Sequence, residues 1–90
     1  MSKAKKEVVK IAVLQRGWVY IGFFSQSGKM CKLEKAACIR WWGTSKGLGE
    51  LVNGPTTNTV LDKAGVVEFN ILTAVNLIEA NGEKWAQHLV

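Results

Sequence analysis

The sequence has few of the residues from which small proteins build active sites and cross-links. Among its 90 residues are one histidine, one aspartate and two cysteines. Cys31 and Cys38 lack the Cys-x-x-Cys spacing of redox and zinc motifs, so we expect both to be free structural thiols. His88 lies two residues from the end of the sequence, in no catalytic pattern with a serine or cysteine. We therefore expect no metal site and no histidine-based catalysis.

The sequence also has little that would support phosphoryl transfer or catalysis by paired carboxylates. The run Gly43-Thr-Ser-Lys-Gly-Leu-Gly has glycines and a lysine, but not in the order of a phosphate-binding P-loop. Glycoside hydrolysis needs two facing carboxylates, and Glu50 with Asp62 is the one acidic pair near this run. The sequence thus predicts a protein that is not an enzyme and needs no cofactor.

Long hydrophobic runs are missing too. No apolar stretch approaches the roughly 18–20 residues that cross a bilayer, and no signal-peptide pattern follows the basic N-terminus. We expect a cytoplasmic protein without a membrane partner.

The positive charge is concentrated at one end of the chain. The formal net charge is +5, but Lys3, Lys5 and Lys6 lie in residues 1–6, which we expect to form a flexible basic tail. The rest of the chain has nine basic and seven acidic residues, a net charge of +2. Since nucleic-acid modules concentrate positive charge on the folded surface, nucleic acid is the weaker expectation as a partner.

Residues 7–90 have the size of a single small domain. A chain this short buries a limited share of its surface, so small domains gain stability from disulfides, metals or subunit association. Because the first two are not expected, we expect a homo-oligomer.

β-Branched and aromatic residues predict a mainly β fold, α+β at most. We expect a small antiparallel sheet or barrel of five to six strands, with a short C-terminal helix in Glu83–Leu89 that carries Trp85 inward. The expected strands are 8–14, 18–24, 29–33, 37–42, 66–69 and 75–79, with a helical turn or bend at 34–36. Residues 43–65 are expected to hold a short helix near 48–52 or else to form a loop. Both faces of the second strand are apolar, which places it in the middle of the sheet.

The segment Arg40–Thr59 has the composition of a ligand-binding region. Strand alternation predicts that Arg40 and Trp42 share a face, where a guanidinium can grip an anion and an indole can stack on a ring. Nearby glycines let the backbone approach a ligand, and hydroxyl groups add polar contacts. The predicted ligand-binding residues are Arg40, Trp42, Thr44, Lys46, Glu50, Pro55, Thr56 and Thr59.

The same residues allow a structural interpretation. Because Trp41 and Trp42 are expected to face opposite ways, one of them should lie in the core. Arg40 could pair with Glu50 or Asp62, and the threonines could bond to the backbone. Residue chemistry alone supports the two interpretations equally.

Six short motifs are spread along roughly residues 11–85. They are Arg16-Gly-Trp-Val, Arg40-Trp-Trp-Gly-Thr, Gly47-Leu-Gly-Glu-Leu, Gly54-Pro-Thr, Thr59-Val-Leu-Asp and Lys84-Trp. Together they resemble a family of small, mostly uncharacterised proteins encoded by bacteriophages and prophages. Trp41 departs from the family pattern, which has a more polar or basic residue there.

The resemblance implies a function by analogy with other short phage proteins. These include counter-defence sponges, which sequester the nucleotide signals of bacterial immune systems such as CBASS and Thoeris. The implied protein is a phage-encoded anti-defence sponge in the host bacterial cytoplasm, binding a small nucleotide-derived immune signal. Motif positions that imply ligand contacts are Arg40, Trp42, Thr44, Glu50, Pro55, Thr56 and Thr59.

Two other classes of function stay open. One is a small barrel that binds single-stranded nucleic acid, with Trp18, Tyr20 and Phe24 as stacking platforms. The other is a protein-directed inhibitor that blocks a host enzyme through its aromatic surface. Steep salt dependence of binding would mark the first, and capture of a host protein the second.

Overall fold

Five antiparallel strands form one sheet in the computed structural model, which describes residues 8–43 and 47–89. The strands are β1 (Val9–Leu14), β2 (Val19–Ser27), β3 (Met30–Trp41), β4 (Val60–Asn70) and β5 (Ala74–Ala80). Their order is β4-β3-β2-β1-β5, so β2 is central and β5 returns to pair with β1. The predicted mainly β fold and the central place of the second strand are confirmed. The expected basic tail, residues 1–6, lies outside the described residues.

Short helical turns connect the strands. They are η1 (Gln15–Gly17), η2 (Leu48–Asn53), η3 (Ile71–Thr73), α1 (Gly82–Trp85) and η4 (Ala86–His88). Gly54 ends η2 at φ 112° and donates its N–H to the Leu51 carbonyl, as expected for a glycine cap. Asn81 begins α1, its side-chain oxygen accepting from the Glu83 N–H at 3.0 Å. The two predicted helical segments are therefore confirmed.

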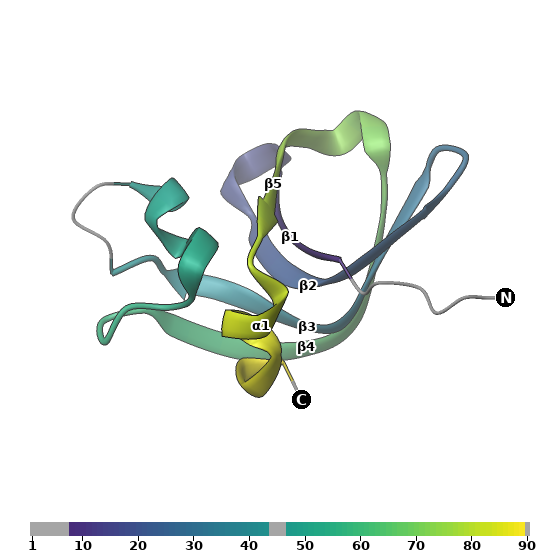
Figure 1. Ribbon diagram of the computed structural model, residues 1–90. Helices are drawn as coiled ribbons and strands as arrows, with labels where there is room; N and C mark the ends of the chain where they lie inside the picture. Colours follow the sequence, from purple (N-terminus) through teal and green to yellow (C-terminus); the bar gives the residue numbers. More distant parts are fainter. Residues whose placement is uncertain (1–7, 44–46, 90) are drawn as a thin grey trace, which may run out of the picture.

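Both faces of the sheet are covered by apolar side chains. On one face, residues from β1, β2, β3 and β5 pack against η2 and against the C-terminal segment, residues 82–89. This cluster contains Val9, Ile11, Val19, Ile21, Ala37, Ile39, Leu51, Ala80, Trp85 and Leu89. On the other face lie Ala12, Cys31, Leu33, Ala36 and Phe69. Figure 1 shows why one sheet can enclose the second cluster: it curls into a half-open barrel, and η3 carries the chain from β4 back to β5.

β3 corrects the prediction of two separate strands at 29–33 and 37–42. The chain stays in one strand, and the pairing registers slip between Leu33 and Ala36. Lys35 has a φ of 52° at this bulge, so the expected bend is present but does not end the strand. The extra residue switches sides: Leu33 and Ala36 face one cluster, whereas Ala37 and Ile39 face the other.

β4 also differs from prediction, since it begins at Val60 rather than near Val66. Its first half pairs with the end of β3, with Asp62 opposite Cys38 and Val60 opposite Trp41. Polar and small residues in this half hid the strand from sequence reasoning. This extension fixes Asp62 beside the end of β3.

In the part of the chain described, no helix is long and apolar enough to span a membrane.

Candidate functional site

A pocket of about 350 Å³ lies at the end of β3 and is lined by Arg40, Trp41, Trp42 and Gly43. Its volume falls in the range of small-molecule sites, which is roughly 300–1,000 Å³. Ile39 is the last buried residue of β3, and the chain continues past the core from there. The predicted pair Arg40 and Trp42 is thus brought to one pocket.

The expectation that Trp41 or Trp42 belongs to the core is wrong. Trp41 is 66% exposed and Trp42 is 40% exposed. Strand alternation predicted that one of the two side chains faces the core, but the buried core residues do not extend as far as this end of β3. Trp41 pairs with Val60, which is itself exposed, so neither tryptophan is covered. Trp85 is the buried tryptophan instead, and its predicted inward position is confirmed.

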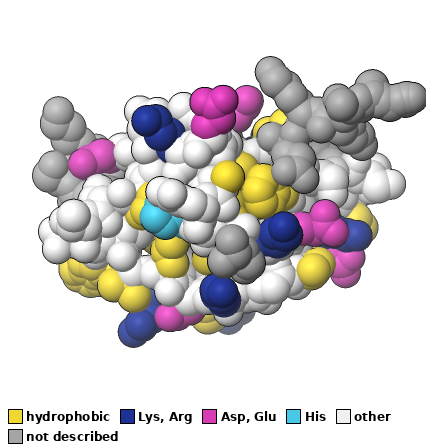
Figure 2. Space-filling view, turned by 60° about the horizontal axis from the view of Figure 1, so that its bottom comes forward, with side chains coloured by type: hydrophobic (Ala, Val, Ile, Leu, Met, Phe, Trp, Pro, Cys, Tyr) yellow, Lys and Arg dark blue, Asp and Glu magenta, His cyan; other side chains and the backbone are white. Residues whose placement is uncertain are grey.

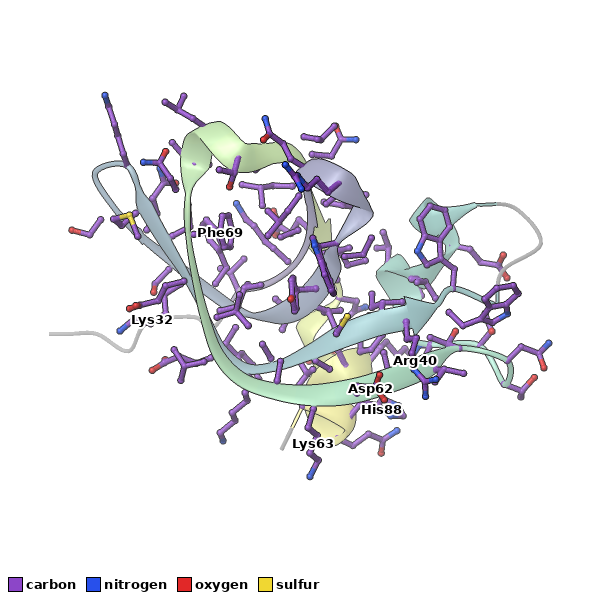
Figure 3. All side chains as sticks on the ribbon, turned by 180° about the vertical axis from the view of Figure 1, so that it is seen from behind. Lys32, Arg40, Asp62, Lys63, Phe69 and His88 are labelled. Atoms are coloured by element: carbon purple, nitrogen blue, oxygen red, sulfur yellow. The ribbon has the colours of Figure 1, made fainter. Side chains whose placement is uncertain are left out.

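Arg40 pairs with Asp62 across β3 and β4. The Arg40 Nε lies 2.8 Å from the Asp62 Oδ2, and Nη2 donates to Oδ1 at 3.4 Å. Figure 3 shows the two side chains lying against each other, far from Phe69 at the other end of the sheet. Of the two structural partners considered for Arg40, Asp62 is the one observed. Both side chains are more than half exposed, so solvent screens the pair strongly.

Two threonines fasten the backbone below the tryptophans. The Thr59 hydroxyl donates to the Trp42 carbonyl at 2.6 Å, and the Thr56 hydroxyl donates to the Gly43 carbonyl at 2.7 Å. The Thr59 oxygen also accepts from the Thr56 N–H at 2.9 Å. These hydroxyls therefore hold the start of the pocket in place, as the structural interpretation of the threonines expected, and their role as ligand contacts stays a prediction.

Gly43 makes the close approach that this clamp requires. It has a φ of 66°, and an added Cβ would collide with the Asn58 carbonyl group and lie 2.6 Å from the Thr59 nitrogen. The sequence had suggested that glycines here bring the backbone near a ligand. At Gly43 the backbone instead approaches the protein's own 56–59 turn.

The remaining predicted contacts are scattered or not described. Thr44 and Lys46 lie outside the described residues. Glu50 is exposed on η2, and Pro55 is half-buried just before the 56–59 turn. Of the six predicted residues that the structure describes, the pocket lining includes two, Arg40 and Trp42.

Sequence reasoning missed the contribution of Trp41 to the pocket. The available signal was the position of Trp41, two residues past Ile39 and two residues before Gly43, where a strand is ending. Alternation rules assume a neighbouring layer on the inner face, and a strand end can lack one.

Cys38 lies between the ion pair and an aromatic pair on the same face of the sheet. It pairs with Asp62 on β4 and with Tyr20 on β2. Trp18 stacks on Tyr20, with ring centroids 6.3 Å apart and planes 15° from parallel. Partial burial raises the pKa of the Cys38 thiol, Asp62 raises it further, and Arg40 opposes them.

One face of the molecule has charge of mixed sign. Figure 2 shows Lys and Arg side chains interspersed with Asp and Glu over the face it displays. Within residues 8–43 and 47–89, no group of three His, Cys, Asp or Glu side chains is placed to hold a metal ion. The exposed indole rings can stack on a planar ligand, and the Arg40 guanidinium can bind an anion. Both are interactions that bind a ligand.

Comparison of the sequence with models of protein families finds no match, and comparison with curated proteins finds no significant one.

Proposed function

We propose that this protein is a non-catalytic binding protein that captures a planar, nucleotide-like anion and acts by sequestering it. The observation that carries the proposal is the pocket at the end of β3, where two exposed tryptophans and Arg40 surround about 350 Å³. Stoichiometric capture needs a tight site and no catalytic groups. The residue chemistry of this site matches that requirement.

The backbone at Trp42 and Gly43 is anchored by hydrogen bonds, which supports a preformed site. Hydrogen bonds from Thr56 and Thr59 fix the carbonyls of Gly43 and Trp42. A platform that is already ordered loses little conformational entropy when a ring stacks on it. Exposed indoles on a fixed backbone therefore favour binding of a flat aromatic group.

Arg40 is suited to a ligand that carries few negative charges. Its pairing with Asp62 already balances one positive charge, yet its side chain is still 67% exposed. A screened surface ion pair contributes about 0–1 kcal/mol, so an incoming phosphate can compete for the guanidinium. Asp62 meanwhile repels any ligand with dense negative charge.

The proposed setting is supported by the resemblance to small phage proteins and by analogy with other short proteins of that kind. A phage-encoded sponge would act in the cytoplasm of the host bacterium against a nucleotide-derived immune signal, as a homo-oligomer whose neighbouring subunits help to enclose the ligand. Native mass spectrometry of the protein purified from bacterial cells reports the subunit number and any bound small molecule together. A bare monomer would remove the oligomeric part of the proposal.

Titration calorimetry with cyclic dinucleotides and ADP-ribose derivatives tests the binding site. We expect Trp42→Ala to weaken binding by roughly 10-fold, the usual loss for one aromatic stacking partner. Asp62→Asn should instead tighten binding, because it releases Arg40 and removes a repelling carboxylate. A gain of affinity cannot arise from damage to the fold.

Leu72→Ala serves as the matched control, since Leu72 is 73% exposed on η3. It should leave binding unchanged. If no nucleotide binds the unaltered protein, or if Trp42→Ala and Asp62→Asn have no effect on binding, the proposal is wrong.

A second candidate function, binding of single-stranded nucleic acid, is favoured by one observation. Trp18 and Tyr20 form a stacked, partly exposed aromatic pair of the type that receives bases. The mixed surface charge in Figure 2 counts against it, because such proteins follow the phosphate backbone with a positive groove. A gel shift at low salt with poly-dT and poly-rU distinguishes the two functions.

A further inference from the structure

The β1–β2 connection presents a second aromatic platform close to the pocket. Trp18 is 55% exposed, and its ring lies nearly parallel to that of Tyr20, which is half-buried. Single exposed apolar side chains are ordinary on protein surfaces. A large ring that lies nearly parallel to a second ring, with centroids 6.3 Å apart, is less ordinary, because the pair presents two aligned aromatic faces.

The backbone at this platform is held in a constrained shape. Arg16 has a φ of 69° and Gly17 a φ of 83°. The Leu14 N–H donates to the Trp18 carbonyl at 2.7 Å, which closes the turn. A non-glycine residue in the left-handed region costs free energy, and such strain gathers at functional sites. The turn fixes the backbone that carries Trp18.

The sheet register relates this platform to Arg40. Tyr20 lies opposite Cys38, and Cys38 lies opposite Asp62, so the three side chains form a row on one face across β2, β3 and β4. Asp62 holds the Arg40 guanidinium on that same face. Neighbouring strands are about 4.8 Å apart, which puts the platform on the order of 10 Å from the ion pair.

Arg40 therefore connects the row that begins at the aromatic platform with the Trp41–Trp42 pocket. Arg40 belongs to both, because it lines the pocket as well as pairing with Asp62. A ligand with one ring would occupy one platform and leave the other empty. Two rings joined through phosphate groups would reach both, with the linker over Arg40.

We propose that Trp18 and Tyr20 form a second ring subsite, and that the ligand is a dinucleotide with two bases. This inference rests on the proposed capture of nucleotides at the pocket and names the ligand class. The net charge of +2 outside residues 1–6 favours a short, free dinucleotide over a long polyanionic strand.

Calorimetry with matched ligands tests the second subsite. The probes are cyclic di-AMP, cyclic di-GMP and cyclic GMP-AMP, with AMP and GMP as their one-base counterparts. For the dinucleotide that binds, we expect the one-base counterpart to bind roughly 10-fold more weakly or worse. Trp18→Ala should remove this advantage and leave mononucleotide binding unchanged, whereas Trp42→Ala should weaken both.

Controls separate a lost subsite from a damaged fold. Trp18→Phe keeps a ring at the platform and should retain most of the dinucleotide advantage. Val75→Ala removes an apolar side chain of similar exposure, 61%, from β5 and should leave the affinity for both mononucleotide and dinucleotide unchanged. Circular dichroism melts of each variant report whether the sheet stays intact.

Each result has a distinct meaning. If mononucleotides bind as tightly as dinucleotides and Trp18→Ala is silent, the second subsite is overturned while the pocket stands. If a 20-base single strand binds better than every dinucleotide and the difference grows as salt falls, the occupant is a nucleic acid and the dinucleotide assignment is wrong. If nothing binds, this inference and the proposed function fail together.

Discussion

Gly43 is the residue on which the geometry of the pocket most depends. It combines a left-handed φ of 66° with contact against the Asn58–Thr59 backbone. We predict that Gly43→Ala lowers the free energy of unfolding by about 3 kcal/mol or more, since the left-handed conformation alone costs roughly 1–2 kcal/mol. Urea denaturation followed by circular dichroism measures the loss.

Gly28→Ala separates the two causes. Gly28 has nearly the same φ, 60°, but nothing lies within 4 Å of an added Cβ. It should lose only the conformational part, about 1 kcal/mol. Equal losses at the two glycines would mean that the 56–59 turn moves away easily, and the clamp would then not be rigid.

Cys38 reports the charge balance beside the pocket. Burial and Asp62 raise the pKa of its thiol, and Arg40 lowers it. The reactive form is the thiolate. Asp62→Asn should therefore lower the pKa and speed alkylation by iodoacetamide, with the pH profile moving to lower pH. Arg40→Gln should slow alkylation and move the profile to higher pH.

The two substitutions are expected to shift the alkylation rate in opposite directions, which a general loosening of the fold would not do. Loosening of the sheet would expose Cys38 in both variants and speed both reactions. Cys31, which is buried on another part of β3, should stay unreactive throughout and is the internal standard. Parallel changes in the two variants would show that Asp62 and Arg40 do not set the thiol pKa.

At the residue scale, the sequence located the site better than it described it. Arg40 and Trp42 were predicted to lie together because they are two residues apart in the expected strand 37–42, and both line the pocket although β3 ends at Trp41. Their surroundings depend on contacts across 17 to 22 residues, such as Thr59 to Trp42 and Arg40 to Asp62. The partners of these polar groups follow from the start of β4, which the local pattern does not reveal.

At the scale of elements, the short helices η2 and α1 cover one face of the sheet. Trp85 from α1 is fully buried, and its Nε1–H donates to the Leu51 carbonyl of η2 at 2.7 Å. The Asn81 N–H donates to the Val52 carbonyl at 2.8 Å. These bonds join η2, which follows the pocket in the chain, to the C-terminal segment.

Trp85→Phe tests that connection. It removes the indole N–H, leaves the buried Leu51 carbonyl without its donor and opens a small void. We predict a loss of about 2–4 kcal/mol in the free energy of unfolding. Trp41→Phe makes the same chemical change at a residue 66% exposed and should stay within about 0.5 kcal/mol. Chemical denaturation of both variants gives the comparison, and similar losses would contradict the assigned roles.

Elements were predicted well where β-branched and aromatic residues are dense. The bounds of β1, β2 and β5 lie within three residues of those expected, because such residues favour strands. β3 was divided by the Lys35 bulge, since an extra residue reverses the alternation and resembles a break. The start of β4 was missed because an edge strand exposes most of its side chains, and Asp62, Lys63 and Gly65 carry little strand propensity.

At the scale of the whole molecule, stability depends on both faces of one small sheet being covered. The barrel interior is enclosed by the curl of the strands, but the opposite face relies on η2 and the last residues of the chain. Trp85 and Leu89 are 0% and 2% exposed there. A domain of this size has roughly 5–10 kcal/mol of stability in total.

The C-terminal segment should therefore be required for folding. Ending the chain after Ala80 exposes the cluster built on Ile11, Ile21 and Ile39, and we predict that this shortened protein is largely unfolded at 25 °C. Each large buried side chain lost costs about 2–5 kcal/mol, so removing two approaches the whole stability. Amide dispersion in a proton–nitrogen NMR spectrum distinguishes a folded from an unfolded chain.

Substitutions at full length decide whether burial or chain length matters. Trp85→Ala with Leu89→Ala should reproduce the unfolding, whereas Glu83→Ala with Gln87→Ala, both exposed in the same segment, should keep a dispersed spectrum and a cooperative melt. If the first pair also melts cooperatively at an unchanged midpoint, the segment is an appendage. The uncovered sheet face would then need another cover, for which the second subunit of an oligomer is the available source, and the melting midpoint should rise with protein concentration.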